Sequence, residues 1–257
     1  MHTILATADV LIEIIEGGAD EDQINVADYI TDRLDREGFA RKTLLNRDLK
    51  KGEQGWMKIP KKWYPRDKYR QPSEFQIVNT IGIDNMELAQ SPGLKKAVAD
   101  QIYESILVQE DRLWKKLADE SPSRPFTNFQ EMKTALGKEI PPSQWILGSK
   151  AWSKFVVGAD LDPVSKRELV QTGKILKYLG LPIHTDFHRE PNVKVLDEND
   201  IYLVGEPKYV GVRQVRKPLE VLEGPHPLGK PETVFNYNTI QSITLANPNG
   251  VVRRQIS

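Results

Sequence analysis

One predicted helix, over residues 92–119, constrains the fold of this chain more than any other sequence feature. Apolar residues recur along it at the spacing of one helix face, at Leu94, Val98, Ile102, Ile106, Leu113 and Leu117. Pro92 stands at the first helical position, where proline is favoured, and Pro122 ends the helix. At about 1.5 Å per residue such a helix is about 40 Å long. That is nearly twice the usual globular length, so we expect an extended molecule built along it.

Composition excludes several classes of protein. The chain has 257 residues and no cysteine, so it forms no disulfide and uses no cysteine nucleophile. Its 36 Lys and Arg balance 36 Asp and Glu, which disfavours a dedicated nucleic-acid binder because such proteins carry a net basic surface. No apolar run approaches the roughly 20 residues that span a bilayer, and the N-terminus lacks a secretory signal. We expect no membrane partner and a cytoplasmic location.

Residues 49–84 combine basic and aromatic side chains with Pro60, Pro65 and Pro72, which disfavour a helix. The strand-like stretches 56–59 and 74–78 predict a long two-stranded hairpin with a basic, aromatic tip. Its candidate contact residues are Trp56, Lys58, Lys61, Trp63, Tyr64, Arg66, Tyr69 and Arg70. We expect these side chains to cover a neighbouring protein surface. The alternative is that the aromatic rings stack on single-stranded nucleic acid.

The remaining segments predict a mixed α/β region with shorter elements before it. Helices are expected at 8–15, 25–37, 129–136, 149–157 and 162–179, the last ending at Gly180. Strands are expected at 144–147, 182–186, 193–196, 201–205, 210–215 and 235–246. On the long helix, Glu104, Glu110 and Asp111 are expected to form a solvated face with Lys115 and Lys116 one turn further on.

The sequence holds no motif that identifies an active site. Gly-rich phosphate loops, a G-x-S-x-G elbow and an H-E-x-x-H pair are all absent. His184 and Asp186 have the His-x-Asp form of a non-haem iron site, with His226 as a distal candidate ligand. On a strand, residues 184, 186 and 188 would share one face. Asn236 stands where an oxygenase would carry its cosubstrate-binding Arg, so we expect no metal, no cofactor and no enzymatic activity, with an iron oxygenase as the less favoured alternative.

Several motifs, taken in order, resemble the major capsid proteins of tailed bacteriophages, which adopt the Hong Kong 97 fold. These motifs are REGFARK at 36–42, EDRLW at 110–114, DPVSKREL at 162–169, IHTD at 183–186, KVL at 194–196, IYLVG at 201–205 and ITLANP at 243–248. The resemblance covers the chain from about residue 36 onward. Its most specific stretch is 162–205.

The resemblance implies an α+β fold with four parts. Residues 1–48 would form the N-terminal arm, 49–84 the extended E-loop, 85–125 with 225–257 the P-domain around its spine helix, and 126–224 the A-domain. It also implies that the chain assembles with itself into pentamers and hexamers of an icosahedral head, in the host cytoplasm, as part of the virion. Portal, scaffolding and decoration proteins, and non-specifically packaged double-stranded DNA, would be its other partners.

Overall fold

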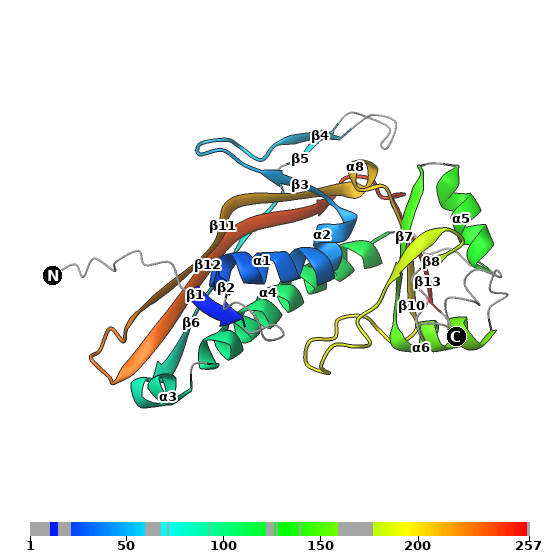
Figure 1. Cartoon of the computed structure of the whole chain (residues 1–257). Helices are drawn as coiled ribbons and strands as arrows, with labels where there is room; N and C mark the ends of the chain where they lie inside the picture. The colour runs from blue at the N-terminus through cyan, green and yellow to red at the C-terminus, as the bar shows by residue number, and fades with distance from the viewer. Residues whose placement is uncertain are drawn as a thin grey trace.

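The computed structural model describes residues 11–14, 22–59, 68–70, 72–91, 93–121, 126, 128–138, 140–158 and 177–255. They form an elongated α+β protein in which two sheets are joined along one long helix (Figure 1). A four-stranded sheet has the order β3-β11-β12-β6, and a five-stranded sheet has the order β13-β10-β7-β9-β8. Two short ribbons, β1–β2 and β4–β5, complete the strands of the described ranges.

The long predicted helix is confirmed as α4, Leu94–Asp119, with 26 residues. Its apolar stripe packs on the four-stranded sheet and on α1, Val26–Glu37, and burying this stripe stabilises the helix more than intrinsic propensity does. Ile102 and Ile106 of α4 and Ile30 of α1 are completely buried. Asn25 caps α1 by accepting the Ala27 N–H at 2.8 Å, and α2, Phe39–Thr43, follows directly.

The four-stranded sheet extends along α4. Its strands are β3 (Leu45–Asp48), β6 (Glu74–Asp84), β11 (Gly211–Pro225) and β12 (Glu232–Leu245). β11 and β12 form a long antiparallel hairpin, β6 pairs antiparallel with the outer side of β12, and β3 pairs parallel with β11. Ile77, Phe235 and Tyr237 point toward α4 and join its core cluster. The short helix α3, Asn85–Gln90, links β6 to the α4 segment.

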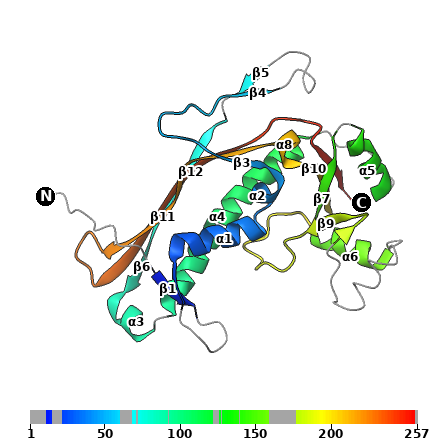
Figure 2. The ribbon, with the colours of Figure 1, turned by 45° about the horizontal axis from the view of Figure 1, so that its top comes forward.

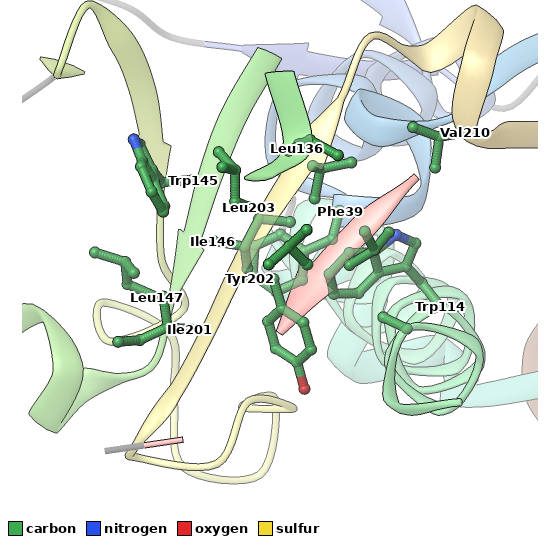
Figure 3. Close-up of a cluster of buried hydrophobic side chains, with 14 of the residues drawn as sticks. Phe39, Trp114, Leu136, Trp145, Ile146, Leu147, Ile201, Tyr202, Leu203 and Val210 are labelled. Atoms are coloured by element: carbon green, nitrogen blue, oxygen red, sulfur yellow. The ribbon is translucent and has the colours of Figure 1, made fainter. Parts of the chain in front are cut away.

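A second hydrophobic core is formed by the five-stranded sheet and the elements packed against it. The sheet consists of β7 (Pro142–Leu147), β8 (Lys177–Tyr178), β9 (Leu181–His184), β10 (Asp200–Gly205) and β13 (Val251–Gln255), with α5 (Phe129–Gly137), α6 (Ser149–Gly158) and α8 (Pro207–Val210) packed nearby. Trp114 from the end of α4 enters this core and meets the Tyr202 ring edge-on, with ring centroids 5.4 Å apart (Figure 3). The single helix α4 therefore contributes to both cores.

Some local predictions are wrong. Residues Leu11–Ile14, expected in a helix, form strand β1 and pair with β2, Asp22–Asn25, since the isoleucines suit a strand at least as well. Strand 193–196 is absent, because its backbone turns toward Asp186. Gly180 ends no helix; with Leu179 it forms a tight turn between β8 and β9, both at positive φ. Residues 162–176 of the predicted helix lie outside the described residues.

Hairpin pairing also differs from the prediction. β4 (Met57–Ile59) pairs with β5 (Lys68–Arg70), whereas residues 74–78 belong to β6 and pair with β12. Two strand pairs join segments that were predicted to belong to different domains. β11, assigned to the A-domain up to residue 224, pairs along the P-domain strand β12, and β13 pairs with β10. The boundaries themselves stay a prediction.

Candidate assembly surfaces

The β4–β5 hairpin carries the residues predicted to contact a neighbouring subunit. Trp56 directly precedes β4 and is 49% exposed. Lys58 is exposed within β4, opposite Tyr69 of β5, and Arg70 lies opposite Met57. The other predicted contact residues, Lys61, Trp63, Tyr64 and Arg66, lie outside the described residues. The hairpin brings the four described residues together, and their contact with a neighbour stays a prediction.

The base of the hairpin is tied to the four-stranded sheet. The Gln214 side chain donates to the Gly55 carbonyl at 3.2 Å, and the Leu49 N–H donates to the Val215 carbonyl at 2.8 Å. A Cβ at Gly55 would lie 2.5 Å from the Gln214 amide oxygen, so glycine permits this close approach. Among the described residues, the strands β4 and β5 pair only with each other. The hairpin is thus held firmly at its base and projects from the sheet edge (Figure 2).

Strand β6 forms the opposite edge of the same sheet. It is 11 residues long, most of its outward side chains are exposed, and Val78 is 62% exposed. An edge strand of this length leaves backbone N–H and C=O groups ready to pair with another chain. Its outer face also carries amide and hydroxyl side chains, with Gln76 donating to Asn238 at 3.0 Å and Thr80 to Asn236 at 2.6 Å.

A buried charge cluster joins α2, α4 and the sheet, and we call it the Glu110 cluster. The Glu110 carboxylate, completely buried, accepts from Arg41 at 2.9 and 3.0 Å, from Arg213 at 3.3 Å and from the Gln241 amide at 2.7 Å. Arg41 also pairs with Asp35 at 2.8 Å. Burial alone would raise the pKa of Glu110, but Arg213 and Arg41 outweigh it and hold that pKa at about 2.

Asp111, next on α4, anchors a second set of contacts. Its carboxylate accepts the Phe39 N–H at 2.8 Å and an Arg189 N–H at 2.9 Å. Arg189 also donates to the Glu37 carbonyl at 2.7 Å and lies over the Phe39 ring. Because Arg189 comes from the segment between β9 and β10, these contacts tie the five-stranded half of the protein to α1 and α2.

The predicted solvated face at Glu110 and Asp111 is therefore wrong. Both carboxylates are completely buried because three arginines, from three different segments, reach them. A signal was available in the sequence: Glu110 follows Ile102 and Ile106 at four-residue spacing, which places it on the buried stripe. Lys115 also differs from expectation, since it bridges Asp119 at 2.8 Å and Asp197 at 3.0 Å, whereas Lys116 is exposed.

The candidate metal ligands His184, Asp186 and His226 each contact other groups in the structure. His184 Nδ1 lies 3.2 Å from Lys42 Nζ, and Asp186 accepts the Val195 and Leu196 N–H groups at 2.7 and 2.8 Å. His226 instead accepts the Leu228 N–H in the β11–β12 turn. Within the described ranges, no group of three His, Asp or Glu side chains is arranged to hold a metal ion.

The environment of His184 predicts a pH dependence of stability. Burial, with the nearby Lys42 charge, lowers the pKa of His184 to about 4. An unfolded histidine binds a proton near pH 6.5, so the folded state should lose stability as the pH falls from about 6.5 toward 4. In a His184→Gln variant this component disappears, and the stability difference between wild type and variant should change across that window. Urea denaturation of unassembled subunits at pH 7 and pH 5 measures it; a constant difference would contradict it.

Comparison with known proteins shows which solved structures share this fold. No protein-family model and no curated protein matches the sequence. A virus-like particle from Pyrococcus furiosus is similar in structure, with a TM-score of 0.58 and 13% identity over 90% of this chain and 98% of that one. A chain of Mycobacterium phage Adephagia has a TM-score of 0.56 and 10% identity over 85% and 90%. An encapsulin complex from Synechococcus elongatus PCC 7942 has a TM-score of 0.51 and 10% identity over 82% and 84%.

These similarities define the class of fold. The chain has the α+β Hong Kong 97-like capsid fold, and the similarity extends over most of its length. At this low identity the similarity concerns the fold and assigns no individual residue a role. Among the described residues, no helix is long and apolar enough to cross a bilayer.

Proposed function

We propose that this protein is the structural subunit of an icosahedral bacteriophage head, which assembles into pentamers and hexamers and encloses double-stranded DNA. The observation that carries the proposal is the capsid fold, shared over 90% of this chain with a virus-like particle. Portal, scaffolding and decoration proteins are its proposed further partners, and the virion, assembled in the host cytoplasm, is its proposed location.

The shape of the subunit supports self-association. The β4–β5 hairpin and the long β6 edge both leave backbone or aromatic surface without a partner in the described part of the chain. An isolated two-stranded hairpin is marginally stable in water, so it gains most from a neighbouring surface. A shell provides such a surface for every copy.

We also propose that the protein is not an enzyme. The completely buried carboxylates of the described residues are each paired with a base: Glu110 with Arg41 and Arg213, Asp111 with Arg189, and Asp200 with Lys115. The iron-oxygenase alternative gains no support from the geometry, because Asp186 Oδ2 accepts two backbone N–H groups and His226 contacts the Leu228 N–H in the β11–β12 turn. Nucleic-acid binding by the basic hairpin is an alternative that the experiments below distinguish.

Particle formation tests the proposal. We expect the expressed protein to form closed shells or capsomers, in megadalton species visible by negative-stain electron microscopy and light scattering, alone or with co-expressed phage assembly factors. A strictly monomeric species at high concentration with those factors present would contradict a shell function. Particles that enclose protein cargo and no DNA would favour an encapsulin-like compartment over a phage head.

A further inference from the structure

Three nitrogen donors from separate segments lie together where α2 faces the five-stranded half of the subunit. Lys42 Nζ of α2 lies 3.2 Å from Nδ1 of His184, the last residue of β9. The Arg189 guanidinium, from the segment between β9 and β10, lies over the Phe39 ring with its carbon 4.7 Å from the ring centroid. Phe39 and Lys42 are three residues apart on α2, so they are neighbours on one face of that helix. We call Lys42, His184 and Arg189 the Lys42 cluster.

Each member of the Lys42 cluster has an N–H group without an acceptor in the described part of the chain. The Lys42 ammonium has three N–H groups, and His184 Nδ1 is its only described hydrogen-bond partner. Since Nδ1 accepts from Lys42, the neutral His184 ring carries its proton on Nε2, and no described residue accepts from Nε2. Arg189 donates to Asp111 and to the Glu37 carbonyl, but its buried Nε–H has no partner among the described residues. Because buried polar groups are almost always hydrogen-bonded, an orphan donor of this kind indicates an acceptor such as a bound ion or water.

The carboxylates of this region are engaged by other groups. Among the described residues, no Asp or Glu forms an ion pair with Lys42, although Glu37 and Asp111 are close enough to affect its charge. Asp111 pairs with Arg189 at 2.9 Å, and Glu37 accepts the Tyr103 hydroxyl at 2.6 Å. Lys42 is therefore partly buried without an ion-pair partner in the described ranges. Such a charge favours an anion over water as the missing acceptor.

The protonation of the cluster agrees with a missing anion. Burial, with the Arg189 charge, lowers the pKa of Lys42, and burial, with the Lys42 charge, lowers the pKa of His184 to about 4. Both shifts arise because positive charge is disfavoured in a partly buried place where like charges meet. An anion bound between these side chains would reverse both effects.

We propose that the Lys42 cluster binds a small oxyanion of the phosphate type, which accepts hydrogen bonds from Lys42, His184 and Arg189. Hydrogen bonds between cationic donors and an oxyanion are among the strong ones, and here they join α2 to the segment between β9 and β10. A free ion fits the site better than the phosphate of a polymer, because Lys42 and His184 are partly buried and Arg189 is 7% exposed. The site lies within one subunit, so it goes beyond the shell function and does not depend on it.

Thermal melting of unassembled subunits tests the site, with inorganic phosphate as the probe. About 20 mM phosphate at pH 7, compared with chloride at the same ionic strength, should raise the melting temperature by about 3 °C, because a ligand of the folded state stabilises it. Lys42→Met keeps the aliphatic part of the side chain but removes the charge, and it should lose most of this rise. Phosphate also stabilises proteins through exclusion from their surface, so the part of the rise that Lys42→Met loses measures the site. The matched control, Lys116→Met, changes an exposed lysine of α4 and should keep the full rise.

Proton NMR of the histidine rings gives a second readout that needs no change at Lys42. Bound phosphate should raise the pKa of His184 from about 4 by about one unit, because a nearby negative charge favours the protonated ring. Chloride at the same ionic strength should leave it unchanged. The His184→Gln variant identifies the His184 signal and separates it from that of His188, whose side chain is 53% exposed.

The outcomes decide between a bound ion, water and nucleic acid. If the rise in melting temperature is equal in wild type and Lys42→Met, or the His184 titration is the same in phosphate and chloride, water satisfies these donors and the proposal is wrong. If Lys42→Met does not fold, the His184 titration of the wild type decides alone. A His184 titration that responds to mixed-sequence double-stranded DNA but not to free phosphate would overturn the small-ion site in favour of nucleic acid. Particle formation is scored separately, so failure of the shell function would leave this result standing.

Discussion

Replacing residues 57–70 with a short Gly-Ser turn is expected to abolish particle formation while leaving the subunit folded. The strands β4 and β5 pair only with each other in the described ranges, so their removal breaks no other strand pair. Among the described side chains of this segment, the largest expected cost is the loss of Ile59, which is 1% exposed; burying such a side chain contributes about 1.5–3 kcal/mol. A domain of ordinary stability tolerates this loss. Circular dichroism and thermal melting measure whether the subunit stays folded, and electron microscopy measures whether particles form.

A single substitution also tests whether a neighbouring subunit covers the hairpin. Trp56→Ala removes a ring that is 49% exposed in the subunit, so the melting temperature should hardly change. If a neighbour covers the ring, assembly should weaken, because large aromatic side chains contribute strongly at the centre of interfaces. Normal particles from both variants would mean that the hairpin is no intersubunit contact. Unfolding of the shortened protein would instead assign the hairpin to its own subunit's core.

The main elements of the fold could be predicted from the sequence where a single periodic signal dominates. The helix α4, the all-buried strand β10 and the helix α5 were each expected within a few residues of their observed position. Local sequence patterns did not predict the structure where partners that are distant in the sequence determine it. Residues 74–78 are correctly strand-like, but their partner β12 lies more than 150 residues away, and no local pattern names it.

The same contrast between local patterns and distant partners holds for the residues of the candidate assembly surfaces. The exposure of Trp56 and Lys58 agrees with the predicted basic, aromatic hairpin, whereas the contact of this hairpin with a neighbour stays a prediction. The spacing of Glu110 from Ile106 placed it on the buried stripe, but a carboxylate on a helix is ordinarily solvated, and no local pattern indicated the partners that allow its burial. Only the folded chain brings Arg41 and Arg213 to it from positions 69 and 103 residues away.

Glu110→Ala is expected to destabilise the subunit by about 3–5 kcal/mol, the cost of leaving a buried partner charge unpaired. Arg41 and Arg213, whose side chains are each 6% exposed, would lose the carboxylate that both contact. Gln241 would lose its acceptor as well. Against a typical stability of about 5–15 kcal/mol, such a loss unfolds much of the population at moderate urea. Urea denaturation of unassembled subunits at pH 7 measures the change.

Two further variants separate charge pairing from simple packing. Glu120→Ala removes an exposed carboxylate just after the same helix, so its effect should stay within about 0.5 kcal/mol. Glu110→Gln keeps the shape but not the charge and should also remove an acid-sensitive component of stability. The Glu110 pKa of about 2 lies below its unfolded value, so that component is complete above about pH 4.5 and is lost as the pH falls toward 2. If Glu110→Gln is as stable as wild type at pH 7 and equally acid-sensitive, Glu110 contributes through its shape and not through its charge.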